Sequence, residues 1–342
     1  MSRKISRSFI NGRAGAGTAG QGIKVEWDST NDGELHWKDV DESSLEVTPV
    51  WYGDRGIFSG GHSGGSPCAS NSSYIDYVSI STGGNAATFG TRNESNTVSA
   101  GHSNGTRHIA TGGGCTAPRS NSMEYLTFST LGNGTDFGDL TENMSTHGGL
   151  SDGTTGVAGG SSPTSNTMSY WTISTLGNAT DFGNLISGRR GLAGGSNSTR
   201  GLFGGGTDGG NYSAIDYITV ATTGNAQDFG DLTLARQYAG NTCVSDETRC
   251  LFAGGETSVY NDNIDYVTVA TTGNATDFGN LSESKHRVAG CSDGTTGIFA
   301  GGYANGTYSD RIDKITIQTT GNAVDSGDLS VARSGTAGAA GD

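Results

Sequence analysis

Short stretches of β-branched and aromatic residues, separated by turn residues, recur along the chain after residue 54. The clearest copy spans residues 264–302. Within it, residues 264–269 are β-branched and aromatic, which is typical of a packed strand, and residues 277–281 carry one large apolar side chain. Residues 287–291 are small, and residues 297–300 run into a glycine pair. The unit therefore predicts four short strands, and no stretch has an apolar stripe at helical spacing.

The unit is repeated six times. Each copy contains a Gly-Asn dipeptide, whose residues tolerate the positive φ angles of a tight turn. Spacings of 48, 45, 47, 49 and 48 residues separate successive dipeptides, a period near that of propeller blades. Small residues in one strand and bulky residues in the next suit a wedge-shaped blade. The sequence therefore predicts an all-β protein with a six-bladed β-propeller over residues 55–342. The asparagines of the dipeptides are Asn85, Asn133, Asn178, Asn225, Asn274 and Asn322.

Three further residue types recur at fixed places in the copies. The glycine pairs begin at Gly60, Gly112, Gly159, Gly204, Gly254 and Gly301. The tyrosines are Tyr77, Tyr125, Tyr170, Tyr217 and Tyr266, and the outer aromatic residues are Phe89, Phe137, Phe182, Phe229 and Phe278. This order, followed by the Ala-Arg-Ser-Gly of residues 332–335, resembles the kelch repeat of galactose-oxidase-like β-propellers. The resemblance implies a kelch-like propeller, and the sixth copy departs from it with Lys314 and Ser326.

The two ends of the array predict how the ring closes. The chain starts its first copy at Arg55 without a small-residue strand and stops just after a sixth such strand, residues 332–342. We expect this C-terminal strand to complete the first blade. The alternative inner strand, residues 45–52, is less suited because Pro49 removes a hydrogen-bond donor from the ladder.

Residues 1–54 do not belong to the array and form a separate segment. The first 24 residues are basic and contain no acid, whereas residues 25–50 hold eight acids against one lysine. Apolar residues alternate around Asn31-Asp32-Gly33, which predicts a hairpin, although a frayed terminus is the alternative. We expect this arm and hairpin to be an assembly anchor. Its expected partner-binding residues are Arg3, Lys4, Arg7, Arg13, Trp27 and Trp37.

Charge and composition narrow the classes of partner. A net charge of −14 argues against a broad nucleic-acid surface, which needs clustered lysine and arginine. No apolar run approaches the roughly 18 residues that a membrane-spanning helix requires, and the N-terminus lacks the apolar stretch of a secretory signal. We therefore expect no membrane insertion and assembly in a host cytoplasm. Among the five cysteines, Cys243 and Cys250 could face each other across a hairpin, but free buried thiols are the expected state.

Candidate catalytic and metal-binding patterns are weak. Acids recur near the outer strands, but residues on separate blades lie too far apart to cooperate, so we expect them to cap tight turns. His62 and His102 could converge on a metal, although exposed loop histidines are the expectation. Serine nucleophile elbows and phosphate-binding loops are missing as well. We expect no catalytic residues, no metal and no cofactor. The acids are Asp136, Asp139, Asp181, Asp228, Asp231, Asp277, Asp325 and Asp328.

The Gly/Thr/Asn-rich, near-identical array resembles β-propellers encoded by tailed bacteriophages and carried on virions. This resemblance implies a non-enzymatic structural protein, associated with capsid or tail in a homo-oligomeric context, that docks through its N-terminal arm onto other virion proteins. The alternative is an adhesin that binds a host receptor or glycan through loops that differ between copies, 61–74, 205–215 and 255–264. A third alternative, a copper-type oxidase or a hydrolase, is disfavoured because the recurring tyrosines lie in mid-strand, where packing accounts for them.

Overall fold

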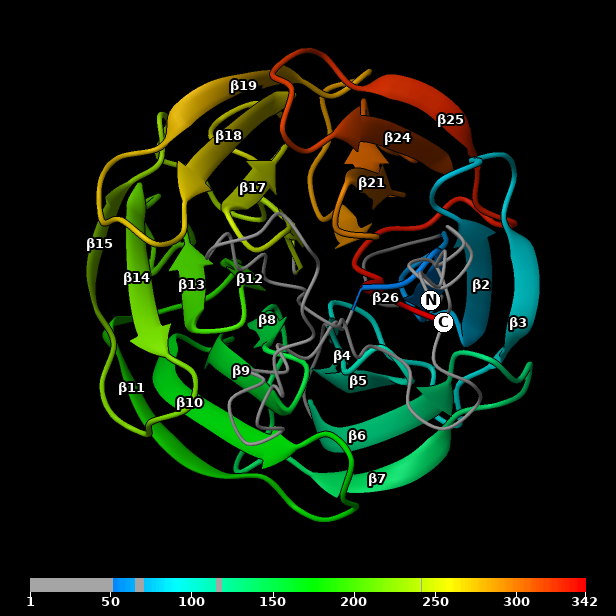
Figure 1. Cartoon of the computed structure of the whole chain (residues 1–342), viewed down its shortest axis with the longest axis horizontal. Helices are drawn as coiled ribbons and strands as arrows, with labels where there is room; N and C mark the ends of the chain where they lie inside the picture. Colours follow the sequence, from blue (N-terminus) through cyan, green and yellow to red (C-terminus); the bar gives the residue numbers. More distant parts are fainter. Residues whose placement is uncertain (1–51, 65–70, 115–118, 241) are drawn as a thin grey trace, which may run out of the picture. The chain divides into compact units, whose positions relative to one another are not determined.

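A computed structural model of the chain describes residues 52–64, 71–114, 119–240 and 242–342. The chain divides into two units, residues 1–50 and 51–342. The N-terminal arm and hairpin, including all six expected partner-binding residues, lie outside the described residues. In the second unit, six four-stranded sheets follow one another around a ring (Figure 1). The prediction of an all-β protein with a six-bladed β-propeller is confirmed.

Each blade is an antiparallel sheet of four strands, which lie side by side in order from the axis of the ring to its rim. From the inside outward, the first three blades are β26 (Ala337–Gly341), β1 (Arg55–Ser59), β2 (Tyr74–Ser79) and β3 (Ala87–Thr91); β4 (Ala100–Ser103), β5 (Arg107–Gly113), β6 (Ser120–Thr127) and β7 (Thr135–Asp139); and β8 (Gly148–Ser151), β9 (Thr155–Ser161), β10 (Ser165–Thr172) and β11 (Thr180–Arg189). The last three are β12 (Ala193–Ser196), β13 (Arg200–Gly204), β14 (Ala214–Thr219) and β15 (Gln227–Asp231); β16 (Val244–Ser245), β17 (Arg249–Ala253), β18 (Asn263–Thr268) and β19 (Thr276–Asn280); and β20 (Ala289–Ser292), β21 (Thr296–Ala300), β24 (Arg311–Thr316) and β25 (Val324–Asp328). A small hairpin, β22 (Tyr303–Ala304) and β23 (Thr307–Tyr308), projects from the sixth blade.

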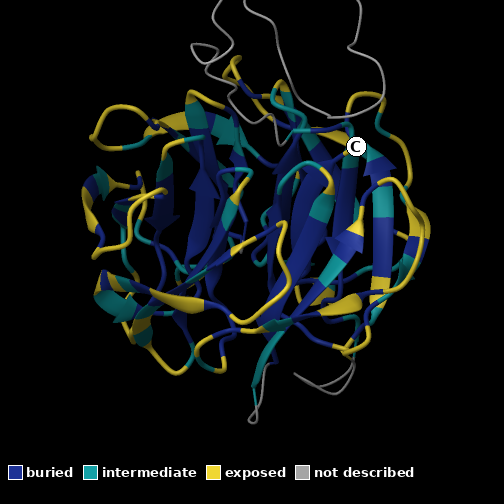
Figure 2. Cartoon of the chain, turned by 60° about the horizontal axis from the view of Figure 1, so that its bottom comes forward, coloured by how far each residue is buried: buried dark blue, intermediate teal, exposed yellow. Residues whose placement is uncertain are grey.

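The alternating strand directions give the ring two different faces. The turn face carries the hairpins between the first and second strands of the blades and the Gly-Asn turns between the third and fourth strands. The loop face carries the loops that follow the glycine pairs and the connections from one blade to the next. The chain enters the propeller at Tyr52 and leaves it at Asp342, both on the turn face. Figure 2 shows buried strands inside the ring and exposed residues in the turns and loops.

The C-terminal strand β26 is the innermost strand of the first blade. It pairs antiparallel with β1, from Arg55 opposite Gly341 to Ser59 opposite Ala337. The strand begins five residues later than the expected start at residue 332. Because β26 fills the inner position beside β1, the first blade joins a strand from the end of the chain to three from its beginning.

Small residues line the axis because the inner strands approach one another closely. A Cβ added to Gly101 would overlap the carbonyl of Gly338, and one added to Gly194 would overlap the backbone of Gly149. Serines near the ends of the inner strands link neighbouring strands, as where the Ser103 hydroxyl donates to the carbonyl oxygen of Ala340 at 2.6 Å. The pocket that these inner strands line at the axis measures about 60 Å³. Glycine is therefore required at the axis by close backbone approach.

The apolar core lies between neighbouring blades rather than within any one blade. Phe58, Phe203, Phe252 and Phe299 are fully buried or nearly so. Near the rim, the recurring tyrosines and phenylalanines form edge-to-face pairs in five blades, with ring centroids 5.6 to 6.3 Å apart. In the sixth blade, Lys314 instead donates to the carbonyl oxygen of Ser81 in the first blade at 2.6 Å. The departure of the sixth copy thus creates a different contact across the closure of the ring.

Candidate functional site

The Gly-Asn turn of each blade caps the outer strand of the preceding blade. In every case, the asparagine side-chain oxygen accepts a hydrogen bond from a backbone N–H on that strand. The donor and acceptor residues are Thr91 and Asn133, Asp139 and Asn178, Asn184 and Asn225, Asp231 and Asn274, Asn280 and Asn322, and Asp328 and Asn85, at 3.0 to 3.1 Å. The six recurring asparagines are therefore joints between blades as well as turn residues.

A glycine in each outer strand makes room for this joint. Gly138 follows Phe137 with φ of 143°, and a Cβ there would overlap the carbonyl oxygen of Gly177 in the next turn. The N–H of Gly177 in turn donates to the carbonyl oxygen of Phe137 at 2.9 Å. The recurring Phe-Gly and Gly-Asn pairs are thus two halves of one contact. The recurrent acids lie in these outer strands, so the prediction that they cap tight turns is wrong for most of them; only Asp325 caps a backbone N–H of its own strand.

Buried ion pairs tie five of the six connections between blades to the blade that follows. In each, a cation from the connection, or in the case of Arg189 from the last residue of the strand before it, meets a carboxylate from the third strand of the next blade. In the pair of Arg236 with Asp265, Nη1 of the arginine lies 2.9 Å from the carboxylate oxygen Oδ2. Nη2 of the same guanidinium group donates a hydrogen bond to the carbonyl oxygen of Phe252 at 3.1 Å. Burial lowers the pKa of Arg236, and Asp265 opposes that shift. The pairs are Arg92 with Glu124, Arg189 with Asp216, Arg236 with Asp265, Lys285 with Asp313, and Arg333 with Asp76.

The connection from the second to the third blade uses an uncharged pair. Met144 stands where four of the other five connections carry the cation, and Ser169 stands where the other blades carry the acid. Both side chains are fully buried, and the Ser169 hydroxyl is hydrogen-bonded to Thr141 at 2.5 Å. Loss of one charge is therefore accompanied by loss of the other, which leaves no charge buried without a partner.

Replacing one member of a buried pair should cost much more stability than replacing both. We expect Arg236→Met to lower the free energy of unfolding by about 3–5 kcal/mol, because Asp265 would remain as an unpaired buried charge. The Arg236→Met/Asp265→Ser double variant reproduces the Met144 and Ser169 arrangement and should cost less than either single change. Urea denaturation of the four proteins measures this coupling. Arg311→Met, at a half-exposed ion pair, is the control, expected to cost less than about 1 kcal/mol; additive effects at residues 236 and 265 would contradict the expectation.

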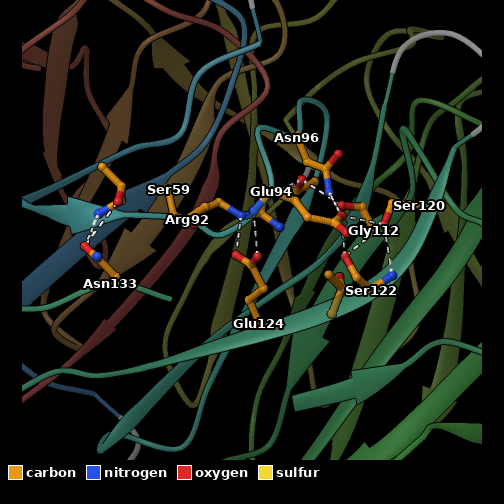
Figure 3. Close-up of polar contacts among 12 residues, drawn as sticks. Ser59, Arg92, Glu94, Asn96, Gly112, Ser120, Ser122, Glu124 and Asn133 are labelled. Carbon is orange, nitrogen blue, oxygen red and sulfur yellow. Dashed lines mark hydrogen bonds and ion pairs between the residues drawn. The ribbon is translucent and has the colours of Figure 1, made fainter. Parts of the chain in front are cut away.

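The first junction contains an additional carboxylate beside its ion pair (Figure 3). Arg92 donates to Glu124 at 3.0 Å, and the backbone N–H of Glu94 donates to the other oxygen of Glu124 at 2.9 Å. The Glu94 carboxylate accepts hydrogen bonds from Asn96, Ser120 and Ser122. Burial works in the opposite direction, but these hydrogen bonds hold the pKa of Glu94 below its usual range. This cluster therefore favours the ionised form of Glu94 beside the Arg92–Glu124 pair.

Three histidines form a buried, neutral group around the second blade. The Thr111 hydroxyl lies 3.1 Å from Nε2 of His102 and 2.9 Å from Nε2 of His147, while His108 contacts the Ser59 hydroxyl at 3.0 Å. Burial lowers the pKa of His102 to about 4 and those of His108 and His147 to about 3. The expectation that His102 is an exposed loop residue is wrong, since it lies in β4 and is buried.

An aromatic cluster gathers on the loop face across the fifth, sixth and first blades. Tyr260 stacks on His286 with ring centroids 4.7 Å apart, and both lie within about 6 Å of the Tyr303 ring. Tyr303 contacts Tyr308 at 5.0 Å, and Tyr308 contacts His62 at 5.1 Å. We call these five residues the aromatic cluster. His62 is buried rather than an exposed loop residue, and it and His102 have different neighbours. The loops 61–74 and 255–264, which were predicted from the sequence as candidate receptor-binding loops, contain His62 and Tyr260 of the cluster. The repeat pattern alone did not show which residues would come together.

Charged residues border the aromatic cluster. Glu256 places a carboxylate oxygen 3.3 Å from Nδ1 of His286, and the guanidinium of Arg287 lies over the Tyr238 ring, 4.5 Å from its centroid. Burial and the charge of Arg287 together lower the pKa of His286 to about 3, which outweighs the nearby carboxylate. Burial also raises the pKa of Tyr260 and of Tyr308. At neutral pH the site therefore offers uncharged rings between one anion and one cation.

The remaining candidate residues have no arrangement for chemistry within the described chain. Cys243, Cys250 and Cys291 are buried free thiols, and burial raises the pKa of Cys243 and Cys291. The described ranges contain no group of three or more His, Cys, Asp or Glu side chains placed to hold a metal ion. The partner-binding residues expected near the N-terminus lie in the part of the chain that is not described.

Comparisons with known proteins leave the family of this chain unassigned. No protein family matches the chain, and no curated protein matches it. Among the described residues, no helix is long and apolar enough to cross a membrane.

Proposed function

We propose that this protein is a non-enzymatic structural component of a larger assembly, a virion of the tailed-bacteriophage type. The observation that carries the proposal is that the recurring residues of the repeat make contacts between blades. These residues are its glycines, asparagines, aromatic residues and ion pairs. The order of these residues, which resembles kelch repeats, supports the same reading. Such residues make the ring a rigid scaffold, since adjacent blades are joined at the axis, in the core and at the rim.

In this proposal, residues 1–54 dock the propeller onto other virion proteins, in a homo-oligomeric context. The chain enters the ring at Tyr52, which packs beside Gly294 and lines the turn-face end of the axial cavity. A basic arm is attracted to acidic partners, and tryptophan is among the residues that dominate interface energies. The proposed contacts are made by Arg3, Lys4, Arg7, Arg13, Trp27 and Trp37.

Deleting residues 2–22 should abolish incorporation into particles while the propeller stays folded. The arm supplies the basic contacts of the anchor, and its removal leaves the described joints between blades intact. Co-purification of tagged protein with particles measures incorporation, and circular dichroism measures folding. Tyr74→Ala, at a tyrosine 47 % exposed, is the control and should be incorporated normally. Normal incorporation of the deleted chain would refute the anchor.

A second candidate function is adhesion to a host receptor or glycan through the loop face. The aromatic cluster favours it, because its rings lie outside the strands that build the ring and gather on one face. The two functions are compatible in one virion protein, since the chain enters on the turn face and the cluster lies on the loop face.

A further inference from the structure

The aromatic cluster occupies a backbone arrangement that is repeated around the loop face. In the fourth blade, Arg190 bridges to Thr207 and Thr207 bridges to Asn211. The corresponding residues are Gln237, Glu256 and Tyr260 in the fifth blade, and His286, Tyr303 and Tyr308 in the sixth. Aromatic side chains thus replace polar ones at matching positions in adjacent blades. Packing of the propeller does not demand them, since the fourth blade forms the same bridges with polar residues.

The rings form a continuous surface rather than separate contacts. From Tyr260 through Tyr303 and Tyr308 to His62, each ring lies within about 6 Å of the next. The three tyrosines are half-buried, so part of each ring faces solvent. Because His62 and His286 are buried, the exposed part of the row consists of the three tyrosines, which is long enough for about two ring-sized groups of a ligand.

Polar groups within the cluster retain hydrogen-bonding capacity. His286 is 7 % exposed, and its Nδ1 lies 3.3 Å from the Glu256 carboxylate without forming a hydrogen bond of good geometry. Nε of Arg287, whose backbone adopts φ of 58°, makes no hydrogen bond within the described residues. Tyr238 has φ of 55° at the matching position, and the other connections carry Val98, Thr146, Gly191 and Gly335 there, all with positive φ. This backbone conformation is therefore a feature of the repeat, and the polar atoms rather than the backbone distinguish the cluster.

We propose that the aromatic cluster, with Glu256 and Arg287, binds an oligosaccharide. Sugar rings present C–H faces that pack on aromatic rings, and their hydroxyl groups pair with carboxylates, guanidinium groups and imidazoles. A row of rings with a few polar groups suits this chemistry. A protein partner would bury about 800 Å² on each side, far more surface than this row of rings supplies. The inference rests on the second candidate function and gives it a site.

Binding to a printed array of neutral, amino and sialylated oligosaccharides, followed by calorimetry with the best binder, tests the proposal. We expect Tyr260→Ala and Tyr303→Ala each to weaken binding at least about fivefold, and the double variant to bind undetectably. Glu256→Gln should weaken binding too, because a carboxylate accepts stronger hydrogen bonds than an amide. Leu131→Ala, at an exposed residue in a turn on the opposite face, should bind like the unmodified chain.

Two results would overturn the proposal: no oligosaccharide bound by the full chain, or unchanged binding by the folded Tyr260→Ala/Tyr303→Ala variant. Equal melting temperatures of the variants show that lost binding is not lost folding. The chain lacking residues 2–22 should bind the saccharide normally. Failure of this inference is therefore distinguishable from failure of the assembly proposal, which that deletion tests separately.

Discussion

Removing residues 332–342 should lower the melting temperature by at least about 10 °C and promote aggregation. The deletion removes β26, the only described strand that joins the end of the array to its beginning within one sheet. It also removes Arg333, which leaves Asp76 fully buried without its 2.9 Å ion pair. An unpaired buried charge alone costs about 3–5 kcal/mol, and the inner edge of β1 would be open to pairing with other chains.

Thermal melting followed by circular dichroism, with gel filtration for aggregation, measures this effect. Two variants separate its causes. Arg333→Met keeps the strand but removes the ion pair, so it should account for part of the loss. Deleting Asp342 alone removes two hydrogen bonds, one that its carboxylate accepts from the N–H of Asp54 and one that its N–H donates to the carbonyl oxygen of Gly105, and should change the melting temperature by only a few degrees. A chain ending at residue 331 that melts like the full chain would show that closure of the ring contributes little.

The free energy of unfolding should fall steeply as the pH drops from 6.5 toward 4. In the folded state, burial depresses the pKa values of His102, His108, His147 and His286 to between about 3 and about 4. In the unfolded state these histidines titrate near 6.5, so below that pH only the unfolded state takes up their protons. Each histidine then removes about 1.4 kcal/mol of stability per pH unit, and the four together about 5–6 kcal/mol per pH unit. Above pH 7 their contribution should be constant.

Carboxylates extend the loss to lower pH. Hydrogen bonds outweigh burial and hold the pKa values of Asp54 and Glu94 below their usual range, so their contribution disappears as the pH falls through those values. Asp216 acts in the opposite direction, since burial raises its pKa. Urea denaturation between pH 7.5 and 4.5 measures the slope, and a folded His108→Gln variant should lose about a quarter of it. A denaturation midpoint independent of pH across this range is the result that would contradict the expectation.

Much of the fold could be predicted because its information is local and repeated. A glycine pair, a tyrosine in a strand and a Gly-Asn turn each predict the conformation of a few neighbouring residues. Six copies of this order make the pattern clear. The small residues Ala289, Gly290 and Cys291 likewise indicate an inner strand, since only such residues fit near an axis. Errors arose where a residue's role depends on another blade. His102 was expected in an exposed loop, yet it is enclosed by Thr111 of its own blade and Leu150 of the next.

The candidate site was much less predictable. Loop 255–264 was noted for its variability, but nothing in one sequence shows that Tyr260 meets His286 and Tyr303. These residues are brought together by three bridged segments from two blades, and bridging depends on how the blades sit around the ring. The anchor residues near the N-terminus, Trp27 and Trp37 among them, stay predictions from sequence.

The sequence by itself determined the all-β class, the number of blades and the kind of residue at axis and rim, because strand propensity, turn chemistry and period act over short distances. The contacts that those residues make with one another were decided by the tertiary structure alone. Asn133 is a turn residue by its sequence and a cap for Thr91 only once two blades meet. Arg236 and Asp265 are ordinary charges along the chain, and they become a buried pair only when packing removes both from water. Such contacts join residues about 30 to 250 positions apart, and no local pattern encodes a distance of that kind.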